Sequence, residues 1–227
     1  MKSQDCLSES EDSSNKLNRF TTLPHLMDML IKRRLVFSDP KFWEDKNDVE
    51  ILKIYQNAKR VKLFVLCFLI GHETIHHWKA YANGISGCCI EFDRAKLEKL
   101  FLAHKSDGVR FEEVNYNTIE EVKVDCVCRF PFLKRHPYKF ENEFRVICIG
   151  KRRAKSFEIS IDDLNVIKRI TLSPQMPVHL FRTIECFLKG VLKVKAKVNL
   201  SRIIKHPDWI GKFKRAKLGE KAAHHEG

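Results

Sequence analysis

The segment Phe140–Gly150, FENEFRVICIG, carries the clearest strand signal in the chain. Alternate residues of a strand share one face, so Glu141, Glu143 and Arg145 are expected to point the same way. The opposite face is almost wholly apolar and must pack in a core. The charged face turns apolar only at its far end, which is typical of a strand that opens into a polar cleft at its near end.

The charged face of this strand has two interpretations. Acids and bases that alternate with apolar residues often form ion-pair ladders on a solvated sheet surface. The same side chains also suit a catalytic or binding site. The strand pattern alone leaves both open.

Outward from this strand, the predicted elements are short and irregularly mixed. Apolar spacing and capping residues predict helices at Leu23–Arg33, Asp48–Lys62, Glu73–Ala82, Arg94–His104 and Val178–Val191. Apolar or alternating runs predict strands at Leu17–Phe20, Leu35–Phe37, Leu63–Leu69, Gly87–Phe92, Val109–Tyr116, Val122–Cys128, Phe157–Ile161, Val166–Leu172 and Val194–Val198. This order favours an α+β fold over a regular parallel βαβ array.

Length and composition limit the class of protein. The 227 residues are 44% apolar and 31% charged, which suits one globular domain that needs neither disulfides nor a structural metal. We expect a disordered lead-in at 1–16, a domain at 17–205 and a basic tail at 206–227. The start lacks the apolar segment of a secretory signal, and the longest apolar run, Leu63–Gly71, is too short to cross a membrane.

Charge and cysteine content bear on partners and compartment. Lys and Arg number 42 against 29 Asp and Glu, a net charge of +13 that favours polyanionic partners. The segment from Lys189 to Lys221 alone holds eleven Lys and Arg against two acids. Without an export signal, the eight cysteines are expected to be reduced, buried thiols in a cytosolic protein.

Two further groups of residues suit ligand binding. Trp78 and Tyr81 are three apart on a predicted helix and could form a flat wall for an aromatic ring, although core packing explains them equally well. Arg19 is a lone charge in a short apolar strand, where a guanidinium suits bidentate phosphate recognition. A surface position is the simpler explanation for a lone arginine.

Taken together and in order, these blocks resemble a widespread bacterial and phage family of domains of unknown function. The resemblance spans about residues 17 to 200. The blocks that carry it are Asn18-Arg19-Phe20, Leu35-Val36-Phe37-Ser38-Asp39-Pro40-Lys41-Phe42, Cys67-Phe68, Trp78-x-x-Tyr81-Ala82, Gly87-x-Cys89-Ile90-x-Phe92, Glu141-x-Glu143-x-Arg145-Val146-Ile147 and Ile170-Thr171-Leu172-Ser173-Pro174.

That family in turn looks like the ADP-ribosyltransferase superfamily. The resemblance implies a mixed, mostly antiparallel split sheet with flanking helices, and NAD as substrate. It further implies that Arg19 clamps NAD, with Trp78 and Tyr81 beside the nicotinamide. Glu143 would be catalytic and Glu141 would orient the acceptor. Cleavage of the nicotinamide–ribose bond develops an oxocarbenium-like cation that a fixed carboxylate stabilises.

The same resemblance implies the other properties expected of such an enzyme. Arg145 would favour the ionised form of Glu143 if the two pair. The acceptor would be a nucleic acid or a protein, a partner protein could regulate the activity, and the role would be that of a toxin or a phage-defence effector. The central block lacks the Ser-Thr-Ser of the superfamily.

Three alternatives remain at this level. A metal-dependent nuclease could hold Mg²⁺ with Asp125, Glu141 and Glu143. A zinc site is disfavoured because the C-C and C-x-C spacings of Cys88, Cys89, Cys126 and Cys128 chelate poorly. A non-catalytic nucleic-acid-binding module would use the basic tail, where Trp209 and Phe213 stand among lysines.

Overall fold

The computed structural model describes residues 15–150 and 156–223, with side chains described as far as residue 215. The predicted disorder of the lead-in therefore lies outside the described residues, except that Lys16 already belongs to the first strand. Within the described chain, no helix combines the length and the apolar character needed to cross a membrane.

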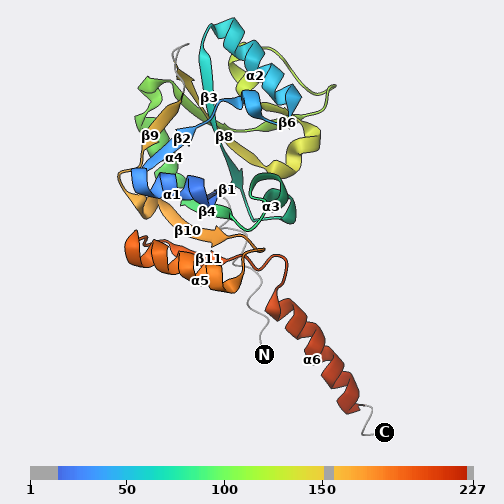
Figure 1. Ribbon diagram of the computed structural model, residues 1–227. Helices are drawn as coiled ribbons and strands as arrows, with labels where there is room; N and C mark the ends of the chain where they lie inside the picture. The colour runs from blue at the N-terminus through green and yellow to red at the C-terminus, as the bar shows by residue number, and fades with distance from the viewer. Residues whose placement is uncertain (1–14, 151–155, 224–227) are drawn as a thin grey trace.

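The helices and strands form an α+β fold, as predicted (Figure 1). The helices are α1 (Leu23–Lys32), α2 (Lys46–Lys59), α3 (Ile75–Tyr81), α4 (Arg94–Ala103), α5 (Val178–Cys186), which continues into the π-helix η6 (Phe187–Val191), and α6 (Pro207–Ala223). The strands are β1 (Lys16–Thr22), β2 (Arg34–Phe37), β3 (Lys62–Ile70), β4 (Gly87–Asp93), β5 (Val109–Glu113), β6 (Asn115–Asn117), β7 (Leu133–Arg135), β8 (Glu143–Gly150), β9 (Phe157–Ser160), β10 (Ile167–Leu172) and β11 (Lys197–Leu200).

Seven strands form the main sheet, in the order β11-β10-β4-β1-β3-β8-β5. All neighbours in it are antiparallel except β10 and β11. β1 pairs with β4 at seven positions but with β3 at only two, Leu17↔Ile70 and Asn18↔Leu69. The sheet therefore splits between β1 and β3 from Arg19 onward, in agreement with the predicted mostly antiparallel, split sheet.

Both faces of the sheet are covered. β3 is apolar throughout, as buried strands are, and its residues alternate between two cores. Phe64, Leu66 and Phe68 pack in the larger core with residues of α1 and α4. Leu63 and Val65 pack in a second core with residues of α2. The candidate site lies at the end of this second core, on the face that α2 covers.

The strand expected at Phe140–Gly150 begins only at Glu143, so that prediction was three residues too long. Asn142 adopts the left-handed conformation, with a φ of 42°, which Asn tolerates better than most residues. Its side chain donates to the Ile70 carbonyl at 2.6 Å, and its own carbonyl accepts from the Ile70 amide at 2.8 Å. Glu141 therefore ends a 3₁₀ helix (His136–Glu141) and does not extend the strand.

Two other predicted strands differ from the structure. The prediction at Val122–Cys128 was wrong: these residues are mostly exposed and run without sheet partners into a 3₁₀ helix (Val127–Phe132). Alternation of apolar and charged residues mimics a strand there, but no sheet edge receives it. The strand expected at Val109–Tyr116 is divided, because β5 joins the main sheet whereas β6 pairs with β7.

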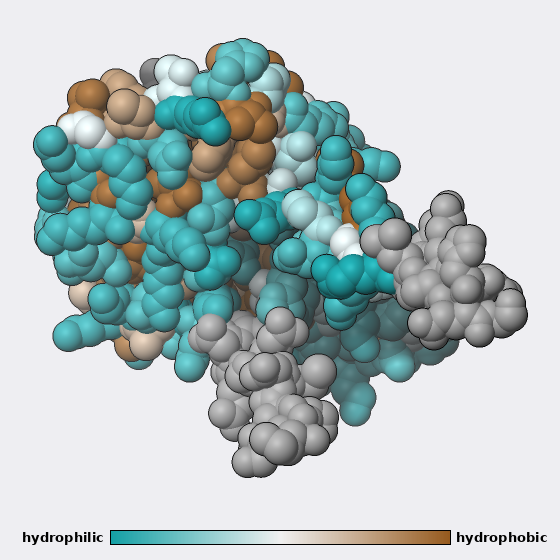
Figure 2. All heavy atoms as spheres, turned by 90° about the horizontal axis from the view of Figure 1, so that it is seen from below, coloured by the Kyte–Doolittle hydropathy of each residue, from teal (hydrophilic) through white to brown (hydrophobic). Residues whose placement is uncertain are grey.

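Helix α6 points away from the body of the molecule (Figure 1). The residues expected to form a tail thus include a helix of 17 residues. Seen from below the view of Figure 1, the surface is predominantly hydrophilic, and apolar residues show in separate groups (Figure 2). This accords with the net charge of +13.

A matched pair of glycines tests the packing of β4. A Cβ added at Gly87 would stand 1.9 Å from the Ala82 carbonyl oxygen, whereas a Cβ at Gly190 meets nothing within 4 Å. We expect Gly87→Ala to destabilise the chain by about 2 kcal/mol or more, because backbone must move. Gly190→Ala should be neutral or stabilising by up to about 1 kcal/mol. Urea unfolding of both variants measures this, and equal effects would contradict the packing described.

Candidate active site

The centre of the candidate site is the guanidinium of Arg145, which is 0% exposed. It donates to both carboxylate oxygens of Asp48 at 3.0 and 2.7 Å, and to both oxygens of Glu143 at 2.7 and 2.8 Å. A fifth bond reaches the carbonyl of Pro131 at 2.9 Å. Every N–H direction of the guanidinium therefore points at an oxygen, which is what a buried arginine requires.

Asp48 comes from the first turn of α2 and was not identified in the sequence. Asp45 caps this helix by accepting from the amides of Asn47 and Asp48. The buried residues of α2 are Asp48, Leu52 and Tyr55, at positions i, i+4 and i+7. An acid on the apolar stripe of a helix is the signal that could have revealed it.

Lys134, on β7, was also missed. Its side chain is nearly buried, bonds the carboxylate of Glu141, and lies 3.5 Å from Glu143 and 3.7 Å from Asp48. The sequence predicts a basic loop at Pro131–Pro137, and nothing in that pattern singles out one lysine among its neighbours. Only its contacts in the folded chain distinguish Lys134 from the neighbouring basic residues.

Glu141 forms the outer edge of this cluster. Its second carboxylate oxygen accepts from the Tyr81 hydroxyl at 2.6 Å, and Tyr81 is 46% exposed. Burial raises the pKa of Glu141, against the opposing effect of Lys134. Burial and the nearby Glu141 carboxylate raise the pKa of Tyr81, so its phenol remains the proton donor.

Glu143 has the opposite electrostatic character, because it lies close to both cations. Burial alone would raise the pKa of its carboxyl, but the charges of Arg145 and Lys134 outweigh burial and lower the pKa to about 2. The nearby thiol of Cys67, opposite Arg145 on β3, lowers the pKa of this carboxyl further. Glu143 is thus a fixed anion.

The charges of the five ionic groups in this cluster do not sum to zero. Asp48, Glu141 and Glu143 provide three carboxylates, whereas Lys134 and Arg145 provide two cations. With Glu141 ionised, the group carries one net negative charge in a region of low dielectric, where that charge acts strongly on a neighbouring cation.

Arg19 lies where β1 parts from β3. Its Nη1 atom donates to the Cys67 carbonyl at 3.4 Å, and burial lowers the pKa of its guanidinium. Within residues 15–150 and 156–215, no carboxylate forms an ion pair with Arg19. A desolvated guanidinium without an anionic partner is suited to bind an anionic ligand.

Trp78 and Tyr81 take different directions from α3. Trp78 is 4% exposed, donates from Nε1 to Glu73 at 2.6 Å and packs with Phe20 and Cys89. Tyr81 instead reaches Glu141, as described above. The structure thus brings Tyr81, Glu141, Glu143 and Arg145 together, and places Trp78 in a small adjoining core.

The residues expected in a nuclease site do not assemble one. Asp125 is exposed, and Lys134 and Arg145 occupy the carboxylates of Glu141 and Glu143. Over the described part of the chain, no group of three or more His, Cys, Asp or Glu residues has the arrangement needed to hold a metal ion.

The cysteines differ from the prediction of reduced, buried thiols at two places. Cys126 and Cys128 are joined in a disulfide on an exposed segment, and Cys186 is exposed. Cys88, Cys89 and Cys148 are buried and free, as predicted, and Cys67 is half-buried. The misjudged pair lies in the segment wrongly expected to be a strand, and Cys6 lies outside the described residues.

Comparisons with known proteins find similarity in solved structures only. Thermus sp. 2.9 DarT in complex with NAD+ is similar with a TM-score of 0.42 and 9% identity, over 83% of this chain and 96% of that one. The same protein with carba-NAD+ gives 0.41 and 10%, over 84% and 96%. With ADP-ribosylated ssDNA it gives 0.39 and 10%, over 83% and 95%. No family model matches the chain, and no curated protein does.

The buried ion pair between Asp48 and Arg145 predicts that the loss of one carboxylate charge lowers the stability of the fold strongly. Asp48→Asn removes one charge from a fully buried pair and leaves Arg145 undercompensated, so we expect a loss of about 3 kcal/mol in unfolding free energy. Glu50→Gln is the control on the same helix, because its partner Lys53 is exposed; its effect should stay within about 0.5 kcal/mol. Urea unfolding measures both, and similar losses would refute the importance of the pair.

The low pKa of Glu143 predicts a specific dependence on pH. A carboxyl with a folded-state pKa of about 2, below its ordinary 4.5, stabilises the fold above pH 4.5, and this contribution is lost as the pH falls toward 2. The destabilisation caused by Glu143→Gln should therefore be larger at pH 6 than at pH 3. Denaturant unfolding of Glu143→Gln and of the wild type across this range measures it. A difference that grows toward acid would contradict the assignment.

Proposed function

We propose that this chain is an NAD-dependent ADP-ribosyltransferase that transfers ADP-ribose to a macromolecular acceptor, or to water when no acceptor is bound. The proposal is supported by this chain's own side chains and by the sequence resemblance described first. It keeps Glu143, Glu141, Arg19, Tyr81 and Arg145 as the functional residues.

The observation that carries the proposal is the meeting of Arg19 and Glu143 at Cys67. Arg19, from β1, donates to the Cys67 carbonyl, and Glu143, from β8, is close enough to the Cys67 thiol for the thiol to lower its pKa. Cys67, on β3, thus lies between a guanidinium that is free to bind phosphate and a carboxylate that is held in one position. A dinucleotide that is cleaved through a sugar cation needs this combination: a cation for its pyrophosphate and an anion for its reacting ribose.

In the proposed reaction, Glu143 stabilises charge. The bond between nicotinamide and C1′ of the ribose breaks, nicotinamide leaves with the electron pair, and positive charge develops on the sugar. Because Glu143 stays ionised at neutral pH, it opposes that charge without prior deprotonation.

Glu141 has the character of a proton acceptor. Its pKa is raised whereas that of Glu143 is lowered, and two carboxyls pushed apart in this way commonly divide acid–base and electrostatic roles. Glu141 would take the proton of the acceptor's nucleophile as the new bond to C1′ forms. Glu141 is itself only 7% exposed, but it accepts from the hydroxyl of Tyr81, which is 46% exposed, so it lies next to a surface that an acceptor can reach.

The remaining residues would position Glu141 and Glu143. Asp48 and Lys134 fix Arg145 and the carboxylates, so they are positioning residues. Tyr81, exposed beside Glu141, is the side chain best placed to contact nicotinamide. Trp78 would act indirectly, by holding α3 against β1 and β4 through Phe20 and Cys89. In keeping with the resemblance, we include a toxin or phage-defence role, with a regulatory partner, in the proposal.

The test is release of nicotinamide from NAD by the purified chain. We expect Glu143→Gln to lower the rate about 10²- to 10³-fold, because the variant removes the anion but keeps the size of the side chain. Chromatographic measurement of nicotinamide over time gives the rate. Near-UV circular dichroism checks that the variant is folded.

Two further variants separate binding from chemistry. Arg19→Met should raise the KM for NAD more than it lowers kcat, because it removes a contact to the phosphates. Glu120→Gln, on an exposed segment, should leave both unchanged. Absence of nicotinamide release by the folded wild-type chain with any acceptor, protein or nucleic acid, would refute the proposed function.

A further inference from the structure

Helix α6 displays two large aromatic side chains to solvent. Trp209 is 64% exposed and Phe213 is 62% exposed. They are four residues apart on one side of the helix, and their ring centroids lie 5.3 Å apart at an angle of 58°. Neither the core clusters nor the hydrogen bonds of the described residues give these rings a structural role.

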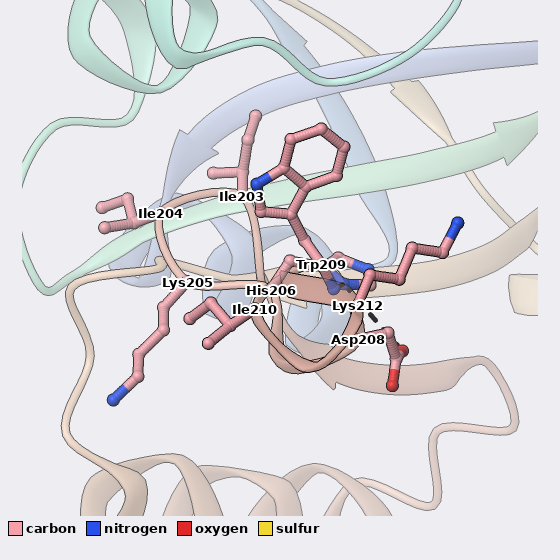
Figure 3. Close-up of a pocket in the computed structure, with 8 residues that line it drawn as sticks. All are labelled: Ile203, Ile204, Lys205, His206, Asp208, Trp209, Ile210 and Lys212. Carbon is pink, nitrogen blue, oxygen red and sulfur yellow. Dashed lines mark hydrogen bonds and ion pairs between the residues drawn. The ribbon is translucent and has the colours of Figure 1, made fainter. Parts of the chain in front are cut away.

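The rings stand among cations. Figure 3 shows a hollow at the start of α6, with Lys205 and Lys212 extending outward from it and the indole of Trp209 beside Ile203. Arg215 adds a guanidinium that lies back over Gly211, since a Cβ there would meet its Nη1 at 3.4 Å. The single acid in the hollow is Asp208, 3.9 Å from His206.

The base of this surface is fixed to the body of the protein. Ser201 donates to Glu73 at 3.0 Å and accepts from the Ile203 amide at 3.3 Å. Ile203 packs against the cluster that contains Trp78. The aromatic and basic side chains therefore begin from a defined anchor beside α3, although helix α6 itself points outward.

We propose that the surface formed by Lys205, Trp209, Lys212, Phe213 and Arg215 binds single-stranded nucleic acid. The two rings offer faces on which unpaired bases stack, and the three cations neutralise phosphates along the strand. The proposal stands on these residues alone and does not depend on NAD chemistry.

Other polyanionic partners fit the surface less well. A duplex keeps its bases stacked on one another, so exposed rings would gain little from it. A membrane needs a long apolar stripe, but in the described part of α6 the two rings stand among charged side chains, namely Asp208, Lys212, Lys214 and Arg215. Charge and exposed rings together favour a single strand.

The experiment measures binding of a fluorescent 12-nucleotide single strand to the full chain by anisotropy, without NAD, between 50 and 200 mM salt. The double variant Trp209→Ala, Phe213→Ala should weaken binding by about tenfold or more. The triple variant Lys205→Ala, Lys212→Ala, Arg215→Ala should reduce the slope of log K against log salt by about 2, at about 0.7 per lost phosphate contact.

Matched controls come from exposed residues elsewhere. Phe42→Ala removes another exposed ring, and the triple variant Lys53→Ala, Lys59→Ala, Lys99→Ala removes the same charge. Both should bind nearly as the wild type does. Thermal unfolding confirms that all variants are folded.

Several outcomes would overturn the proposal. It fails if the wild type does not bind the single strand, or if loss of the two rings leaves its affinity unchanged. It also fails if the duplex formed by this strand and its complement binds as tightly. Loss of affinity of the ring variant for anionic phospholipid vesicles, but not for the oligonucleotide, would likewise contradict it. Binding that is specific for single strands and sensitive to the two rings supports it.

Discussion

The structure of the candidate site depends on the burial of one guanidinium. Arg145 is enclosed between the sheet and α2, and a charge in that position is tolerated only if carboxylates meet it. Asp48 and Glu143 meet it from two elements that are far apart in sequence. The requirement therefore ties α2 to β8 and holds Glu143 in one orientation, with its carboxylate ionised.

This constraint also explains why two neighbouring glutamates differ. Glu143 is close to both cations, whereas Glu141 contacts only Lys134 and shares its other oxygen with Tyr81. The left-handed Asn142 between them takes Glu141 out of the strand and places it beside the exposed Tyr81. A fixed anion and a more basic carboxyl arise from one short motif because the backbone turns between them.

Much of the fold could be predicted from local pattern, since the apolar faces of β3, β8 and α1 are visible in the sequence. The proximity of Glu141, Glu143 and Arg145 also follows from the motif, although Glu141 reaches this group from a turn and not from the strand. Lys134 could not be predicted, because it is one base among several in an irregular segment. The strand prediction at Val122–Cys128 was wrong because alternating apolar and charged residues do not show whether a partner strand is available.

Helix α3 links the two proposed activities physically. His77 caps the helix with Thr74 and donates from Nε2 to the Phe140 carbonyl at 3.2 Å, directly before Glu141. Glu73, which directly precedes the capping residue Thr74, accepts from Trp78 of this helix and from Ser201, near the start of α6. One short helix thus fixes both the outer glutamate and the anchor of the aromatic surface. A strand bound on α6 would be tethered through α3 to the neighbourhood of Tyr81 and Glu141, where the proposed transfer needs its acceptor.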